Sequence, residues 1–394
     1  MAELLRKLDP GFVSRLRALR EDLHRHAELG FAEHETAERI RRWLEPLAPD
    51  ALDCGVAGTG VVALLRGKPG PVVAFRAEMD ALPIQESTGL AFASIHEGVM
   101  HACGHDGHMA IALGAAELLA ACRREFAGSV KLIFQPSEEK LGGAERMIEA
   151  GVLRDPDVDA IYTLHARPQL GTGRIALDPM PSAYADGVDI LITGRAAHGA
   201  YPHTGVDAVV IGSHIICQLQ QIRSREIAPS EPVVVSFGSF QAGRARNVIA
   251  DRAVLGGTVR TRQPAVRQQV LAALERIAVS TARGLGGQAR VELIDSYPRV
   301  CNDPALLALA RRVGGELLGA DRVGETAELT MGGDDFGFYL EEAGGVPGCT
   351  IRLGVETDQA LHTGGFDFGH QALEPGVLLV YNVLRSFLER APGT

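Results

Sequence analysis

The order of strand-like and helix-like segments along this chain constrains its fold more than any other feature. Apolar runs typical of buried strands lie at 60–67, 71–81, 129–139 and 160–167, with a turn expected at 68–70. Segments with the apolar spacing of helices lie at 12–47, 107–124 and 142–150. Strands that alternate with helices favour a mostly parallel sheet covered on both faces. The alternation resumes after residue 303, so the first and last parts of the chain are predicted to form one domain together.

The middle of the chain follows a different order, β-α-β-β-α-β. Its strand-like segments are 187–193, 232–240, 251–261 and 290–295, and its helix-like segments are 205–224 and 264–284. This order is the split-βαβ pattern of a small ferredoxin-like domain. The predicted class is therefore α/β, with a larger domain built from residues 1–183 and 296–394. A ferredoxin-like domain of residues 184–295 is inserted into it.

Composition excludes several classes of protein. The 394 residues carry 39 Lys+Arg against 49 Asp+Glu, a net charge of −10, and only 5% aromatic residues. That balance argues against a nucleic-acid partner. The most apolar window, 110–122, is too short to span a bilayer and contains Glu117, and the N-terminus lacks a signal-peptide core. The six scattered cysteines fit free thiols in a reducing compartment. We expect a cytoplasmic protein with no membrane partner.

The segment MHACGHDGHMA (100–110) holds the densest group of potential metal ligands. These are His101, Cys103, His105, Asp106 and His108, at the start of a predicted helix. A thiolate, imidazoles and a carboxylate together suit zinc or a similar divalent ion. Local spacing leaves open which of the five bind, and a polar helix cap beside a buried cysteine is the alternative interpretation.

Further candidates follow apolar strands or border glycine-rich loops. Glu138 and Glu139 end the segment 129–139, where open α/β sheets place their ligands. Adjacent carboxylates repel each other, so one on a metal and one acting as a base is an economical arrangement. A solvated turn with two glutamates is the alternative. His165 and His362 lie near the ends of other predicted segments, although a lone histidine is more often structural.

Nine segments together resemble a known family. They are HRHAELGFAEHETA (24–37), FRAEMDALPIQE (75–86), MHACGHDGHMA (100–110), FQPSEEKLGGAERMI (134–148), LHARPQLGTGRIA (164–176), AAHGAYPHTGVDAV (196–209), NVIADRAVLGGTVR (247–260), MGGDDFGFYL (331–340) and LHTGGFDF (361–368). In content and order they resemble the aminoacylase/carboxypeptidase family of dinuclear metallohydrolases. The resemblance is to its hippurate-hydrolase and indoleacetyl-amino-acid-hydrolase branch, and it extends over essentially the whole chain.

The resemblance implies a role for each matching position. Two divalent ions per subunit (zinc, manganese, cobalt or nickel) would be held by a set of five residues: Cys103 as the bridging thiolate, His105, Glu139, His165 and His362. Glu138 would be the general base that deprotonates the bridging water. His198, in the inserted lid and dimerisation domain, would stabilise the oxyanion, across the interface of a homodimer or higher homo-oligomer. Asn247 and Arg260 would hold the carboxylate of the substrate.

The implied reaction is hydrolysis of the amide bond of a small N-acyl-L-amino acid, either hippurate-like or N-acetylated. A dipeptidase, an N-carbamoyl amidase and an N-acetyl-diaminopimelate-type deacetylase remain alternatives, as does a catalytically silent binding relative. Cys103 as a covalent nucleophile is a further option, but it leaves the paired glutamates unexplained. The chain contains no GxSxG or GxxxxGK[ST] motif.

The chain departs from the family pattern at four positions. Ala27 follows His26 where the family usually has proline, and Glu78 replaces an aspartate after Arg76-Ala77. Gly333 and Asp334 replace the usual Ser-Glu before Asp-Phe. None of these positions is a predicted ligand or base. We expect them to affect substrate preference and the surroundings of the metal ligands.

Overall fold

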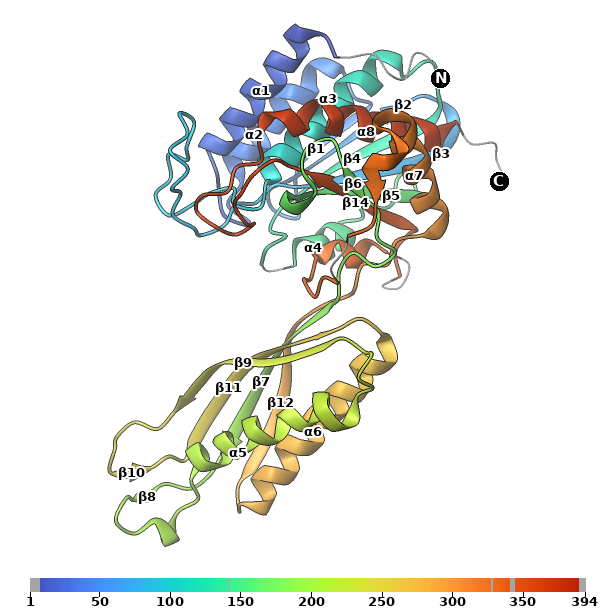
Figure 1. Cartoon of the computed structure of the whole chain (residues 1–394). Coiled ribbons are helices and arrows are strands. Elements are labelled where there is room, and N and C mark those ends of the chain that lie inside the picture. The colour runs from blue at the N-terminus through green and yellow to red at the C-terminus, as the bar shows by residue number, and fades with distance from the viewer. Residues whose placement is uncertain (1–7, 141, 327–328, 341–343, 390–394) are drawn as a thin grey trace. The chain divides into compact units, whose positions relative to one another are not determined.

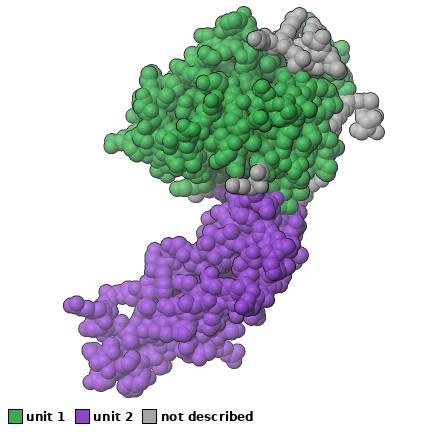
Figure 2. Space-filling view, viewed as in Figure 1, with its two compact units in different colours: residues 1–181, 301–328, 335–394 green, residues 182–300, 329–334 purple. Residues whose placement is uncertain are grey.

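The computed structural model describes residues 8–140, 142–326, 329–340 and 344–389, which divide into two units (Figure 2). Unit 1 contains the described residues of 1–181, 301–328 and 335–394, and unit 2 those of 182–300 and 329–334. Residues 329–334 belong to unit 2 because they bond to it. The N–H of Ala183 donates to Gly332 O at 2.9 Å, and Arg262 Nη1 donates to Thr330 O at 3.0 Å.

Unit 1 is built on an eight-stranded mixed sheet with the order β1-β2-β4-β3-β5-β14-β6-β13 (Figure 1). Its strands are β1 (Ala51–Val56), β2 (Gly60–Arg66), β3 (Lys68–Glu78), β4 (Ala127–Gln135), β5 (Ala160–Arg167), β6 (Ile175–Ala176), β13 (Val323–Gly324) and β14 (Gly348–Gly354). The central strands β4, β3, β5 and β14 run parallel. The carboxyl ends of these four strands therefore meet at one edge of the sheet.

The inner strands from β2 to β14 form near-continuous buried runs, because helices cover the sheet. In β2 the run Val61–Leu65 is buried, and in β3 the run Val72–Glu78. The helices of unit 1 are α1 (Pro10–Arg25), α2 (His34–Leu44), α3 (His105–Cys122), α4 (Gly143–Glu149), α7 (Pro304–Leu318) and α8 (Leu373–Leu388). Apolar side chains of α3 and α8 share one core with those of the sheet. This burial on both faces is what the uninterrupted apolar runs predict.

Unit 2 is a four-stranded antiparallel sheet with two helices, and its order is β12-β7-β11-β9 (Figure 1). Its elements are β7 (Tyr184–Thr193), α5 (Ala208–Gln221), β9 (Val233–Ala242), β11 (Arg252–Thr261), α6 (Pro264–Gly284) and β12 (Gln288–Tyr297). A two-stranded ladder joins β8 (Ala197–His198) to β10 (Val248–Ile249). The inserted β-α-β-β-α-β pattern and the mostly parallel main sheet are both confirmed.

The structure refines or corrects several local predictions. The segment 12–47 contains two helices, α1 and α2, and the chain between them has a left-handed turn at Phe31 (φ 60°) after Gly30. A Cβ on Gly30 would lie 2.4 Å from Ser137 Oγ, so this turn reaches the edge of the sheet only with glycine. The expected turn at 68–70 is the start of β3, and β4 ends at Gln135 rather than 139. Strand β1, half-exposed, has no apolar run and was not predicted.

Short helical turns also occur among the described residues. They are η1 (Glu45–Leu47), η2 (Pro168–Leu170), η3 (Pro202–Thr204), η4 (Ile222–Glu226), η5 (Ala320–Arg322), η6 (Asp335–Tyr339) and η8 (His370–Ala372). Among the described residues, no helix combines the length and apolarity that a membrane crossing requires.

Candidate metal centre and active site

A glycine places two potential ligands at the start of α3. Gly104 is the N-cap of the helix and has φ 86°, a left-handed conformation that few side chains adopt. A Cβ there would lie 2.9 Å from the Phe368 ring. Cys103 precedes the helix and His105 lies in its first turn. The left-handed turn at Gly104 brings both side chains to the same buried region.

The two glutamates lie in a tight loop beyond β4. Ser137 has φ 52°, and its N–H donates to Glu33 Oε1 at 2.9 Å. Glu33 also accepts from Thr59 Oγ1 at 2.6 Å, so a buried carboxylate fixes the loop. Glu138 is buried and Glu139 is partly exposed. The strand ends earlier than predicted, but it delivers both carboxylates to the carboxyl edge of the sheet.

Two histidines from distant parts of the chain meet this region. His165 lies near the end of β5, and its Nε2 is 3.5 Å from Cys103 Sγ. His362 follows β14 in a loop, with φ 63°, and its N–H donates to Ala102 O at 2.9 Å. Its Nε2 is 3.3 Å from Cys103 Sγ and 3.1 Å from Glu139 Oε1.

Cys103 is shared by two groups of potential ligands. In one, the ligand atoms of Cys103, His105 and His165 all lie within 4.8 Å of one another. In the other, those of Cys103, Glu139 and His362 do so. A thiolate between two such triads suits two neighbouring divalent ions. The structure therefore brings together all five predicted ligands, and Glu138 Oε2 lies 4.0 Å from His105 Nε2.

The hydrogen bonding of the His105 ring is that expected of a metal ligand. Its Nδ1 donates to the Asp80 carbonyl oxygen at 2.8 Å, which leaves Nε2 with a lone pair. That buried Nε2 has no hydrogen-bond partner among the described residues. A ligating histidine characteristically donates its other N–H in this way, which fixes the tautomer and the ring orientation. His105 is thus arranged as a ligand.

Crowded negative charge dominates the electrostatics of the site. Burial raises the pKa of the Cys103 thiol well above its ordinary value, and the carboxylates of Glu139 and Glu138 raise it further. Burial alone lowers the pKa of His105, but the carboxylate of Asp80, 3.4 Å from Nδ1, and the charge of Glu78 raise it to about 10. Divalent cations would supply the missing countercharge and keep both groups deprotonated.

The other three residues of the 100–110 cluster have different partners. Asp106 accepts from Arg20 Nε at 2.7 Å and pairs with His24 Nδ1 at 2.9 Å, which joins α3 to α1. His108 Nδ1 lies 2.9 Å from Glu78, and its Nε2 accepts from the Ala166 N–H at 2.9 Å. His101 is buried, and burial lowers its pKa to about 3. Local spacing alone did not separate these three from Cys103 and His105.

Asp80 is a functional candidate that the sequence analysis did not single out. It follows β3, is buried, and holds His105 through its backbone carbonyl. Its Oδ2 accepts from the N–H of Glu139 at 3.0 Å. One residue thus fixes two predicted ligands. The available signal was a carboxylate at the end of a buried strand, inside the segment FRAEMDALPIQE.

The remaining predicted site residues lie in unit 2. His198 on β8 is exposed and is paired with Val248 in the β8–β10 ladder. Asn247 precedes β10, and its carbonyl oxygen accepts from the N–H of Gly199 at 2.7 Å. The structure therefore brings His198 and Asn247 together. Arg260 lies apart on β11, half-buried, with its Nε donating to Thr258 Oγ1 at 3.0 Å.

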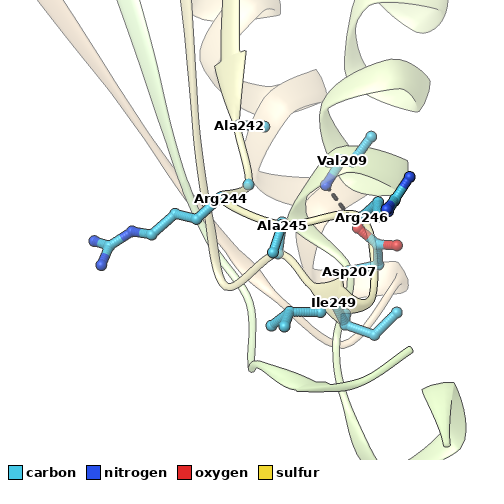
Figure 3. A pocket seen from close by; sticks show the side chains of 10 residues that line it. Asp207, Val209, Ala242, Arg244, Ala245, Arg246 and Ile249 are labelled. Atoms are coloured by element: carbon cyan, nitrogen blue, oxygen red, sulfur yellow. Dashed lines mark hydrogen bonds between the residues drawn. The ribbon is translucent and has the colours of Figure 1, made fainter. Parts of the chain in front are cut away.

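An open hollow of about 570 Å³ lies beside β10 of the same ladder (Figure 3). It is lined by residues 242–246 and 248–250, with Asp207 and Val209. Arg244 and Arg246 extend in opposite directions, so they do not converge on one anion (Figure 3). Asp207 is engaged as the N-cap of α5, accepting from the N–H of Val209 at 2.9 Å. This hollow therefore adds no second chemical site.

The comparisons with known proteins agree with this arrangement. The family model described as "Peptidase family M20/M25/M40" matches residues 74–386. An N-acetylcysteine deacetylase of Bacillus subtilis is 41% identical over 367 residues, which cover 93% of this chain and 94% of that protein. An N-acetyldiaminopimelate deacetylase of Brevibacillus brevis is 36% identical, covering 92% and 95%.

Solved structures extend the agreement to the fold. A dinuclear metal-binding peptidase of the M20 family from Bacillus subtilis superposes with a TM-score of 0.85 at 38% identity, covering 97% of this chain and all of that one. A putative aminohydrolase from Staphylococcus aureus gives 0.88 at 33% identity, covering 96% and 97%. With the ligand geometry, these matches show that the chain belongs to the M20/M25/M40 peptidase family, as a hydrolase acting on amide bonds.

Proposed function

We propose that this enzyme hydrolyses the amide bond of N-acyl-L-amino acids, releasing a carboxylate and a free amino acid. The observation that carries the proposal is the position of Cys103 between two triads of potential ligands. We assign the five ligands to a pair of divalent ions: Cys103, His105, Glu139, His165 and His362. When bound, such ions lower the pKa of water and polarise the acyl carbonyl.

Glu138 is proposed as the general base. It is buried and lies next to the ligand Glu139, with Oε2 4.0 Å from His105 Nε2. A carboxylate at this place accepts a proton from the attacking water and passes it to the leaving amine. The carboxylate need not bind an ion itself, because five other donors surround the two positions.

His198 is proposed to stabilise the oxyanion. Its Nδ1 accepts a hydrogen bond from the N–H of Ala200 at 3.1 Å. The ring proton therefore lies on Nε2, which is free to donate to developing negative charge. We propose that Asn247 and Arg260 bind the α-carboxylate, since a guanidinium suits a carboxylate in a bidentate fashion.

N-acetyl amino acids are the proposed substrates, in preference to hippurate-like ones. Relatives named for deacetylation of acetylcysteine and acetyldiaminopimelate support this preference.

A homodimer in the cytoplasm is proposed as the working form. Strands β9 and β12 are the edges of the sheet of unit 2, and Phe240 and Leu293 on these strands are exposed. A second copy would cover such edges, and His198 would then act in the partner subunit. All six cysteines are free, which supports a reducing compartment. Sedimentation as a monomer at working concentration would count against this form.

One panel experiment tests the function. Amine release is measured from N-acetyl-cysteine, N-acetyl-methionine, N-acetyl-diaminopimelate and hippurate, with purified protein, after chelation, and after adding zinc, manganese, cobalt or nickel. We expect chelator-sensitive, metal-restored release that is fastest with acetyl substrates. Release from acetyl-diaminopimelate alone would favour that more specific deacetylase. No release from folded, metal-loaded protein would refute the proposal.

A further inference from the structure

The carboxyl end of β5 extends beyond its pairing with β3. The two strands pair in parallel only as far as Arg76 and Thr163, two residues before His165. Backbone N–H groups alternate between the two sides of a strand. The N–H of Ile161 donates to Pro347 O, on the side of β14, so the N–H of Ala166 faces the side of β3. At that position the register with β3 has already ended.

His108 from α3 occupies the place of the missing strand partner. Its buried Nε2 accepts a hydrogen bond from the Ala166 N–H at 2.9 Å. Because Nε2 accepts, the ring proton lies on Nδ1, which donates to Glu78 Oε2 at 2.9 Å. Glu78, His105 and His108 also cluster as potential metal ligands. However, both nitrogens of His108 are engaged, so the ring is a support rather than a ligand.

Glu78 connects His108 to further buried polar groups. Its Oε1 accepts from Arg76 Nη1, and Arg76 also donates to Asp335 Oδ1 at 2.5 Å and to Gln135 Oε1 at 2.8 Å. Asp335 Oδ2 accepts from the N–H of Ala144 at 2.9 Å. We call Arg76, Glu78, His108, Gln135 and Asp335 the buried brace. It holds the chain at Gln135 and at Ala144, on both sides of the loop that carries Glu138 and Glu139.

We infer that His108 is a positioning residue for the metal centre. By accepting from the Ala166 amide it fixes the end of β5 and directs the neighbouring His165 imidazole toward Cys103. The rest of the buried brace holds the His108 ring and the loop of the two glutamates. The inference rests on the proposed metal centre but not on the identity of the substrate.

Two substitutions separate the roles of the two ring nitrogens. In H108Q the amide oxygen can take the place of Nε2 and accept from the Ala166 N–H. In H108N the amide group lies at the place of Nδ1, so the contact with Glu78 is kept and the contact with Ala166 is lost. H214N, at an exposed position on α5, is the matched control.

The readout is metal affinity, measured on chelator-stripped protein. Zn²⁺ is titrated in competition with a chromophoric chelator, and the absorption spectrum of bound Co²⁺ reports the ligand geometry. We expect H108N to bind Zn²⁺ about 10–100-fold more weakly and to alter the Co²⁺ spectrum. We expect H108Q to stay much closer to the wild type, and H214N to match it.

Each outcome decides the inference. Equal losses in H108N and H108Q, or wild-type affinity in H108N, would overturn it. If H108N does not fold, H108Q must restore both folding and Zn²⁺ affinity, and its failure to do so also overturns it. If no N-acyl amino acid is hydrolysed but H108N alone loses Zn²⁺ affinity, the proposed function fails and this inference stands.

Discussion

The two units hold their candidate site residues in contrasting ways. In unit 1, His105 and His165 are buried and tied to the backbone by hydrogen bonds. In unit 2, His198 is exposed on a two-residue strand, and Arg260 is half-buried. Buried, hydrogen-bonded groups are held in a fixed geometry, whereas exposed ones pay an ordering cost when a ligand binds. We therefore expect substitutions of site residues in unit 1 to lower kcat. In unit 2 we expect some substitutions to lower kcat, through weaker binding of the transition state, and others to raise KM, through weaker binding of the substrate.

The largest effect is expected for Glu138→Gln. The amide keeps the size of the side chain but cannot accept the proton, so kcat should fall by roughly three orders of magnitude or more. Metal content and thermal unfolding should stay as in the wild type. The exposed Glu145→Gln on α4 is the control and should keep full activity. Loss of metal from the Glu138→Gln protein would make Glu138 a ligand and refute its assignment as base.

His198→Ala should have the next largest effect. Loss of the donor from Nε2 should lower kcat by about 10²–10³-fold, with metal content unchanged. His203→Ala, in the neighbouring turn η3, is the matched control because it is exposed but has no proposed role. An equal, small effect of both substitutions would mean that unit 2 supplies no group to the transition state.

The pH dependence of stability tests the buried charges of unit 1. Burial alone would lower the pKa of His24, but Asp106 raises it from 6.5 to about 9. The pKa of His24 is higher in the folded state than in the unfolded state. Protonated His24 therefore adds to the free energy of unfolding fully below pH 6.5, and this contribution is lost as pH rises to about 9. The difference in pKa corresponds to roughly 3 kcal/mol. Urea unfolding of the wild type should show this loss.

His24→Gln removes the titrating group from that experiment. Its unfolding free energy should change much less between pH 6.5 and 9, and the exposed His214→Gln in unit 2 should keep the wild-type slope. A wild-type slope in the His24→Gln protein would assign the pH dependence to another group.

The smallest effect is expected for Gly333→Ser in unit 2, which restores the usual residue of the family. A Cβ at this position would lie 2.8 Å from Ala185 Cβ and 2.9 Å from Arg260 Nη1. The guanidinium must then move, so KM should rise by about tenfold with little change in kcat. Gly332→Ser, whose Cβ would meet only Thr330 Oγ1 at 3.3 Å, is the control. An unchanged KM would mean that Arg260 does not bind the substrate.

Much of the fold could be predicted, because it depends on patterns that extend over many residues. The buried runs of β2 to β5 and the inserted β-α-β-β-α-β order are visible as apolar periodicity. Strand β1 has no such pattern, and it exists only because β2 offers it an edge to pair with. The turn at Phe31 depends on a contact between Gly30 and the distant Ser137, which local propensity does not encode.

The sequence predicts the kind of chemistry at the candidate site, but not which residues are metal ligands and which support the ligands. Cys103 and His108 belong to one short segment, yet Cys103 Sγ lies near the other proposed ligands, whereas both ring nitrogens of His108 bond to Glu78 and Ala166. The direction of each side chain depends on Gly104 and on the packing of α3, which spacing alone does not reveal. Asp80 carries a weak signal, a carboxylate after a buried strand, but its contact with His105 through a backbone carbonyl has no sequence signature.

The main segment of unit 2 begins and ends at adjacent points, which matters for engineering the protein. The N–H of Val300 donates to Ser182 Oγ at 3.1 Å, so the two ends of the insertion already touch. Domain insertions are tolerated where the joined ends lie close together. Residues 183–299, together with the short segment 329–334 that bonds to them, therefore form a cassette that linker residues could replace at each of the two breaks. The shortened chain would keep all five proposed metal ligands and Glu138, which makes it a natural starting point for building other lids.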